Sequence, residues 1–168
     1  MKRTASFSFG ALLVAAACGA GGAPPSASET FVANLSPRNG VPPVTNAEAS
    51  GSGTCTLTLD LTRDGGGKIT TATAKFEIVL RGFPTTTALT GAHIHKGTAG
   101  ANGDIVIDSG LAAGEVTLTT GGATITKTGR SARADVVTDL ISGPAGFYCN
   151  VHSTVNADGV ARGQLAKK

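Results

Sequence analysis

The chain has 168 residues, of which 15% are charged and 4% are aromatic, and it contains 24 glycines. Its formal net charge is only +3, and two of its basic residues fall within an N-terminal signal pattern, so the charge balance gives no support to nucleic-acid binding. Many glycines and few aromatic residues indicate short strands and frequent turns, in a chain long enough for one domain with its own core.

The N-terminus has the pattern of an export signal. Two basic residues precede an apolar stretch over residues 7–17, which is too short to remain as a membrane-spanning helix. The small residues before Cys18 resemble those of a bacterial lipoprotein signal, which predicts a signal peptide over residues 1–18 and lipidation of Cys18. Cleavage after Ala17 or Ala20 by the ordinary signal peptidase is the alternative.

Residues 19–30 are rich in Gly, Pro and Ser and lack the apolar bulk that a packed core needs. We expect them to form a flexible tether between a lipid-bearing Cys18 and a folded domain over residues 31–166. The protein is then extracytoplasmic and is held at a bacterial membrane by its N-terminal lipid, in the periplasm or at the cell surface. The sequence leaves open which protein or surface ligand it meets there.

Beyond the tether the chain has the pattern of short strands separated by turns. A first strand is expected over residues 31–35. Val41-Pro42-Pro43-Val44 is an extended segment that fits only the edge of a sheet, because proline donates no ladder hydrogen bond. The alternating runs 54–62 and 69–82, joined by Asp64-Gly65-Gly66-Gly67, predict a long β-hairpin.

The second half of the chain predicts further short strands, one helix and a closing hairpin. The helix pattern starts at Ser131, a candidate N-cap, and stops before Gly143-Pro144. The expected elements are strands over 90–95, 104–108, 115–120 and 123–126, a helix over 131–142, and a hairpin of 147–153 with 160–165. The predicted fold class is therefore all-β, an antiparallel sandwich or barrel with one short helix before the C-terminal hairpin.

Two cysteines remain inside the expected domain, Cys55 and Cys149. An even pair in an oxidising compartment favours a disulfide. Each lies on the apolar side of an alternating segment, Cys55 with three leucines and Cys149 with Phe147 and Val151. A bridge between them would close a loop of roughly 95 residues and contribute about 4 kcal/mol through the entropy of the unfolded chain. Two separate buried thiols are the alternative.

All three histidines of the chain fall in two motifs, Ala92-His93-Ile94-His95 and Asn150-Val151-His152. Alternate residues of a strand share a face, so His93 and His95 are expected to point the same way. His152 alternates with the apolar residues of its own segment and is expected on an outer face. The three imidazoles meet only if the two strands are neighbours, which the sequence does not show.

The order of several motifs resembles the CHRD domain, named from chordin and found in many bacterial exported proteins. The matching segments are Phe31-x-Ala33-x-Leu35, Val41-Pro42-Pro43-Val44, Gly91-Ala92-His93-Ile94-His95, Asn102-Gly103, the helix before Gly143, Tyr148-x-Asn150-Val151-His152-Ser153 and Gly159-x-x-Arg162-Gly163-Gln164-Leu165. The resemblance covers about residues 30 to 166 and implies an immunoglobulin-like, Greek-key fold with no established enzyme activity. Chordin's binding of animal growth factors does not carry over to a bacterial lipoprotein.

The histidine motifs also resemble the copper-ligand pattern of copper–zinc superoxide dismutases, in which His-x-His on one strand is joined by a distant histidine. The resemblance implies a copper or zinc site of His93, His95 and His152. If such a site exists, we expect Arg162 to lie just outside its ligands. A bridged copper–zinc pair would need more than the three histidines present. The structural alternative is that the imidazoles hydrogen-bond loop backbone and fix the rim of the barrel. Arg162 either pairs with a carboxylate or lines the histidine face, and the sequence favours the pairing with a carboxylate.

No recognisable catalytic motif accompanies these residues. The chain has no Gly-x-Ser-x-Gly elbow, no phosphate-binding Gly-Lys-Ser/Thr and no His-Glu-x-x-His. Asp104 and Asp108 are interpreted as solvated or turn-capping residues. The sequence therefore favours a noncatalytic, lipid-anchored module that binds a ligand or has a structural role at the cell envelope. A copper- or zinc-binding metalloprotein is the alternative function.

Overall fold

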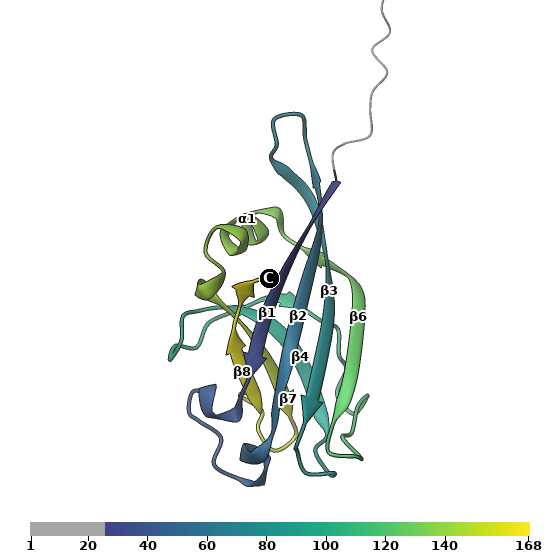
Figure 1. The fold of residues 1–168 in the computed structure, drawn as a ribbon, viewed down its shortest axis with the longest axis vertical. Coiled ribbons are helices and arrows are strands. Elements are labelled where there is room, and N and C mark those ends of the chain that lie inside the picture. The colour runs from purple at the N-terminus through teal and green to yellow at the C-terminus, as the bar shows by residue number, and fades with distance from the viewer. Residues whose placement is uncertain (1–25) are drawn as a thin grey trace, which may run out of the picture.

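Figure 1 shows the computed structural model, which describes residues 26–168 as two β-sheets packed face to face. Five strands form one sheet in the order β6-β3-β2-β1-β9, and four strands form the other in the order β5-β4-β7-β8. All strand pairs are antiparallel. The predicted all-β class is therefore confirmed for the described residues, in the form of a sandwich.

The five-stranded sheet is built around the predicted hairpin. Strands β2 and β3 pair from Ser52↔Arg81 to Arg63↔Ile69 across the glycine-rich turn, and the tip of this hairpin extends beyond the body of the sandwich in Figure 1. The strands of this sheet are β1 Ser26–Leu35, β2 Ser52–Arg63, β3 Ile69–Arg81, β6 Ala123–Ala132 and β9 Ala166–Lys167.

The four-stranded sheet holds both histidine motifs. Its strands are β4 Leu89–Lys96, β5 Ile105–Asp108, β7 Phe147–Ser153 and β8 Ala161–Gln164. The single α-helix, α1 Ala134–Ser142, connects β6 of one sheet to β7 of the other. Three short 3-10 helices, η1 Pro37–Asn39, η2 Ala47–Ser50 and η3 Pro144–Gly146, complete the described elements.

The structure corrects the predicted start of the helix. Ser131 does not cap α1, because it still lies in β6, where it pairs with Thr73. The N-cap position is Arg133, whose side chain makes no capping hydrogen bond. The helix packs against the core through Val137 and Leu140, which are both buried. The pairing of β6 with β3 therefore prevails over the local capping signal.

Two further segments differ from the sequence prediction. Residues 115–120 form no strand: Thr117 makes an isolated bridge to Ala88, and turns at Gly114 and Gly121 confine the pairing to this short stretch. The predicted edge segment 41–44 is also outside both sheets. In both cases too few consecutive backbone groups have a partner to sustain a ladder.

Strand β1 begins before its predicted start. Residues 26–30, assigned to the tether from their composition, pair with the end of β2 from Ser26↔Thr62 onward. A neighbouring strand therefore orders residues that have little apolar bulk of their own. The predicted signal peptide over residues 1–18, the lipidated Cys18 and the remainder of the tether lie outside the described residues. Within residues 26–168, no helix has the length and apolar character that crossing a membrane requires.

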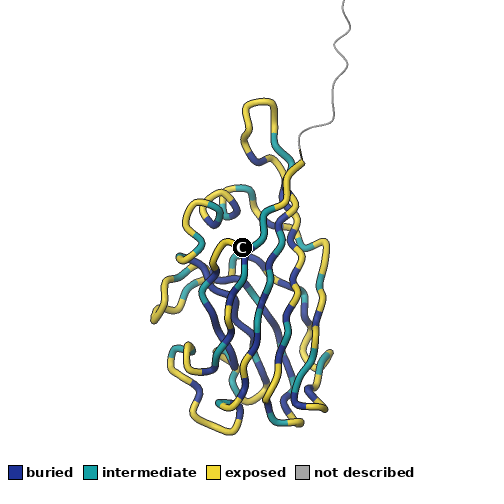
Figure 2. The backbone as a smooth tube through the Cα atoms, viewed as in Figure 1, coloured by how far each residue is buried: buried dark blue, intermediate teal, exposed yellow. Residues whose placement is uncertain are grey.

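The core lies between the two sheets, and Figure 2 shows buried residues along the strands and exposed residues in the loops and at the tip of the β2–β3 hairpin. A disulfide between Cys55 of β2 and Cys149 of β7 crosses this core, with the two Cα atoms 6.6 Å apart. The predicted bridge is thus present, and it joins the two sheets. Because Cys149 faces the core and side chains alternate along a strand, Tyr148, Asn150 and His152 of β7 all face the other way.

Candidate metal centre

The two histidine motifs lie on adjacent strands. Strand β4 pairs with β7, so that Gly91 stands opposite His152 and His93 stands opposite Asn150. His152 is therefore the diagonal neighbour of His93 across the two strands. Since Ile94 and Val151 are buried in the core, all three histidines project from the outer face of the four-stranded sheet. The condition that the sequence left open, that the two strands be neighbours, is met.

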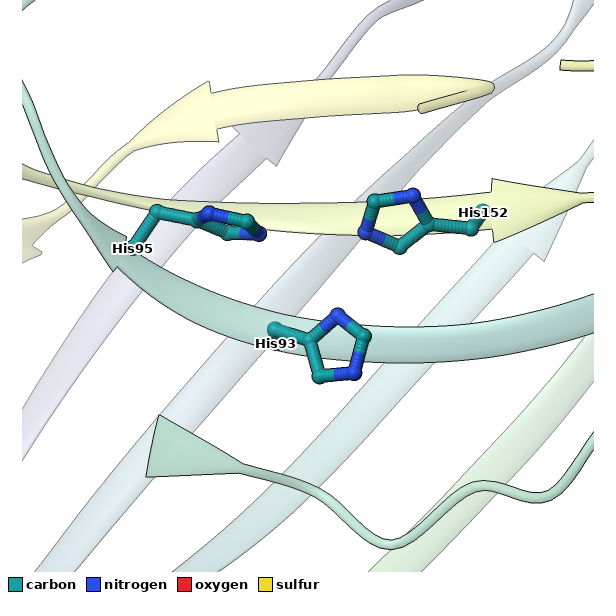
Figure 3. Close-up of side chains that lie close together, drawn as sticks. All are labelled: His93, His95 and His152. Carbon is teal, nitrogen blue, oxygen red and sulfur yellow. The ribbon is translucent and has the colours of Figure 1, made fainter. Parts of the chain in front are cut away.

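The three imidazole rings converge on one point. Each histidine offers a ring nitrogen, and these nitrogens all lie within 4.8 Å of one another. Ring centroids are 5.0 Å apart for His93 and His152 and 5.9 Å apart for His95 and His152. Figure 3 shows the rings of His95 and His152 pointing toward each other, with His93 between them. A single ion with bonds of about 2 Å needs only small ring movements to contact all three.

Backbone carbonyls fix which nitrogen of two of these rings is free. Nδ1 of His95 donates to the carbonyl of Gly103 at 2.9 Å, and Nδ1 of His152 donates to the carbonyl of Ala157 at 2.8 Å. A carbonyl oxygen only accepts, so each Nδ1 carries the proton and each Nε2 keeps its lone pair. These two Nε2 atoms are buried and have no hydrogen-bond partner.

The third ring is oriented by a carboxylate. Oδ1 of Asp108 lies 3.7 Å from Nε2 of His93, which directs the proton to Nε2 and leaves Nδ1 for the centre. That Nδ1 is also buried and without a hydrogen-bond partner. Asp108 additionally accepts from the backbone N–H of Gly110 at 2.7 Å, so the predicted turn-capping role is correct and is combined with a contact to His93.

Burying three ring nitrogens that accept no hydrogen bond lowers the stability of the fold, unless a bound ligand contacts them. Burial is the main cause that lowers the pKa of both His93 and His95, and the neighbouring His152 lowers them further. Both rings are therefore neutral at neutral pH, which is the form that binds a metal ion. The residues fit a mononuclear site for copper or zinc, ions for which imidazole is a suitable ligand.

Arg162 lies just outside the histidines and does not pair with a carboxylate. Its guanidinium nitrogens donate to three neutral oxygens of the 98–102 loop: the carbonyls of Thr98 and Ala101 and Oδ1 of Asn102. No carboxylate lies within 4.0 Å of it among residues 26–168. The favoured pairing with an acid is therefore wrong for this part of the chain, and Arg162 instead fastens the loop over the outer face of the sheet.

Tyr148 connects Arg162 to the histidines. Its ring stacks on His95 with centroids 4.8 Å apart, and the guanidinium carbon of Arg162 lies 3.4 Å from the centre of the same ring. The Tyr148 hydroxyl accepts from the backbone N–H of Gly103, whose carbonyl holds His95. A side chain on Gly103 would overlap the Lys96 carbonyl, so glycine is needed for this close approach.

A buried carboxylate fastens the other side of the centre. Oε2 of Glu48 accepts from Oγ of Ser153 at 2.7 Å and from Nδ2 of Asn156 at 2.5 Å. These contacts hold the turn that carries Ala157, the carbonyl partner of His152. Sequence analysis did not identify Glu48, and no signal in the sequence relates it to a turn more than 100 residues away. Tyr148 could have been identified from the sequence, because it lies four residues before His152 on the same strand and therefore on the same face.

Comparisons with known proteins agree with this architecture. The CHRD domain family matches residues 31–165, a range that contains the three histidines, Arg162 and both cysteines of the disulfide. No curated protein and no solved structure matches the chain. Since the family match spans most of the sequence and nearly all of the described sandwich, the chain belongs to the CHRD domain family.

Proposed function

We propose that this protein is a noncatalytic CHRD module that binds one copper or zinc ion through His93, His95 and His152 at the bacterial cell envelope. The observation that carries the proposal is the convergence of three buried ring nitrogens without hydrogen-bond partners, within 4.8 Å of one another. Purely structural histidines would be expected to use both ring nitrogens when buried. Here one nitrogen of each ring faces the common centre.

The surrounding groups support a site organised for a metal. Each histidine has its second nitrogen directed by an oxygen, the carbonyls of Gly103 and Ala157 or the Asp108 carboxylate. Such outer contacts hold the orientation and tautomer of metal-binding imidazoles. The ligands come from two paired strands, β4 and β7, and the disulfide joins β7 to the opposite sheet, which keeps the centre on rigid elements.

Anchoring at the envelope rests on the N-terminal sequence. The basic start, the short apolar stretch and the small residues before Cys18 support export and lipidation of that cysteine. The disulfide is consistent with an oxidising compartment. Cell fractionation of the wild type and Cys18→Ala tests this part of the proposal. We expect the variant to leave the membrane fraction, and unchanged membrane association would contradict lipidation.

Metal binding is tested on the full chain carrying Cys18→Ala and no histidine tag, freed of metal by a chelator. We expect one equivalent of copper or zinc to be retained and to raise the melting temperature, by an amount corresponding to about 2.7 kcal/mol when free metal is at 100 times Kd. His152→Gln should lower the stability of the metal-free protein by only about 1 kcal/mol and abolish this response.

Because the chain has only three histidines, no other imidazole site can replace this one. Identical metal responses of the wild type and His152→Gln would therefore contradict the three-histidine site. Lack of any retained copper or zinc in the wild type would contradict the proposed function as a whole.

A further inference from the structure

The metal centre has a neutral ligand set. The group of potential ligands in residues 26–168 consists of three histidines and contains no carboxylate and no thiolate. Carbonyl oxygens direct the protons of His95 and His152 to Nδ1, so each ring offers a lone pair and no negative charge. An ion bound here keeps its full charge, which favours an ion of low charge over a divalent one.

The number of ligands points the same way. Zinc takes four ligands, so that a three-histidine zinc site needs a water molecule as the fourth, and Cu²⁺ prefers a tetragonal arrangement with at least four ligands. The three converging nitrogens are each buried, and residues 26–168 bring no fourth His, Cys, Asp or Glu to the group. Cu⁺ has a filled d shell and is stable with low coordination numbers, so three imidazoles are sufficient for it.

A buried positive charge stands next to this centre. The side chain of Arg162 is almost completely buried, with 3% of the residue exposed, and its hydrogen-bond acceptors are neutral oxygens. Only the Tyr148 ring separates the guanidinium from His95. A charge that is itself removed from water acts more strongly on a second charge nearby than an exposed charge does.

The acidic groups close to the histidines do not cancel this charge. Asp108 contacts His93, but its side chain is 53% exposed and it also pairs with Arg130. Asp104, on the His95 side, is exposed. Water screens exposed carboxylates far more than it screens a buried guanidinium. Arg162 therefore contributes a positive potential on the His95 side of the centre, which the screened carboxylates offset only in part.

We infer that this site selects Cu⁺ over Cu²⁺ and Zn²⁺, and that Arg162 is the residue that determines the selection. The inference rests on the proposed metal-binding function and specifies its ion. Arg162 contacts neither the histidine nitrogens nor the ion. It acts through its charge, and a variant that keeps the charge should keep the selectivity even if it loses hydrogen bonds to the 98–102 loop.

The test measures affinities for three ions on the full chain carrying Cys18→Ala and no histidine tag, because a free thiol or a tag would bind Cu⁺. Cu⁺ is maintained with ascorbate under argon, which leaves the disulfide intact, and the intact mass verifies this. Dissociation constants for Cu⁺, Cu²⁺ and Zn²⁺ are obtained by competition with chelators of known affinity. We expect the wild type to bind Cu⁺ at least tenfold more tightly than either divalent ion.

Two substitutions separate the charge of Arg162 from its hydrogen bonds. Arg162→Gln should reduce the ratio of Cu⁺ to Cu²⁺ affinity about tenfold, which is about 59 mV in the copper potential for one electron. Arg162→Lys keeps the charge and should retain most of the ratio. Arg81→Gln removes an exposed arginine from the opposite sheet and is the control, expected to leave the ratio unchanged.

Each result is decisive. Tighter binding of Cu²⁺ or Zn²⁺ than of Cu⁺ by the wild type would overturn the selectivity while leaving the metal site standing, and this measurement needs no variant to fold. An unchanged ratio in Arg162→Gln, or an equal loss in Arg162→Lys, would overturn the assignment to Arg162. Failure to bind any of the three ions would instead refute the proposed function itself.

Discussion

The outer faces of the two sheets differ in how far their polar residues are exposed to solvent. In the five-stranded sheet, β2 and β3 alternate between buried apolar residues toward the core and accessible polar residues toward solvent. In the four-stranded sheet, the outer face is polar but largely buried: Tyr148, Asn150 and Arg162 are each at most 5% exposed. The 98–102 loop and the turn after β7 cover this second face.

This difference indicates that the outer face of the four-stranded sheet has a role other than stabilising the fold. The outer face of β2 needs no partners, because water satisfies it. The outer face of β4 and β7 requires a hydrogen bond for every buried polar atom, and nearly all have one, except the three converging histidine nitrogens. A face that removes polar groups from water and leaves three of them unpaired at one point is typical of a binding site.

The largest expected effect comes from the disulfide that joins the two sheets. The double variant Cys55→Ala/Cys149→Ala should lose about 4 kcal/mol of unfolding free energy, because the bridge restricts a long loop in the unfolded chain. Denaturant titration of the oxidised wild type and the variant measures the difference. A loss below about 1 kcal/mol would mean that the core alone holds the sheets together.

The two faces of β2 are compared by substituting neighbouring residues. Leu57→Ala removes a fully buried side chain and should cost about 3 kcal/mol, whereas Thr58→Ala on the outer face should change stability by no more than about 0.5 kcal/mol. Thermal or urea unfolding of both variants provides the values. Similar costs for the two variants would contradict the assignment of a solvated outer face to this sheet.

The outer face of the four-stranded sheet should respond in metal affinity more than in stability. Asp108→Asn keeps the turn contact to Gly110 but weakens the orientation of His93, and we expect metal binding to weaken about 10- to 100-fold. Unfolding free energy without metal should change by less than about 1 kcal/mol. Asp60→Asn, an exposed carboxylate on β2, is the matched control and should change neither quantity.

The smallest expected effect is a dependence of the metal-free protein on pH. Burial lowers the pKa values of His93 and His95 below the ordinary value of 6.5, so the unfolded chain takes up protons more readily than the folded one. Their contribution to stability is therefore present above pH 6.5 and is lost as pH falls through the lowered folded-state pKa values. Urea titrations in the presence of a chelator measure this slope.

The double variant His93→Gln/His95→Gln is the control for this slope. It should lose much of the pH dependence, because glutamine does not titrate. An equally steep decline in the variant would assign the pH dependence to other groups and remove the argument that burial keeps these two imidazoles neutral.

Strand positions were predictable where alternation was strong, as in the β2–β3 hairpin and β7. The same alternation predicted that His93 and His95 share a face and that Cys149 faces the core. It failed at residues 115–120, whose β-like composition lacks a long partner strand, and at Ser131, where pairing with β3 prevails over a local capping signal. Local patterns are insufficient where a neighbouring strand decides the outcome.

The sequence by itself determined the class of fold and the side of each strand to which a residue belongs, because these depend on composition and on the alternation of residues along a strand. It favoured a bridge between Cys55 and Cys149, which the structure confirms. Only the tertiary structure decided that β4 and β7 are neighbours, that their register brings His152 beside His93, and that Arg162 is buried without an acid. These facts depend on contacts between distant segments, such as Arg162 with the 98–102 loop, and no local sequence pattern encodes such contacts.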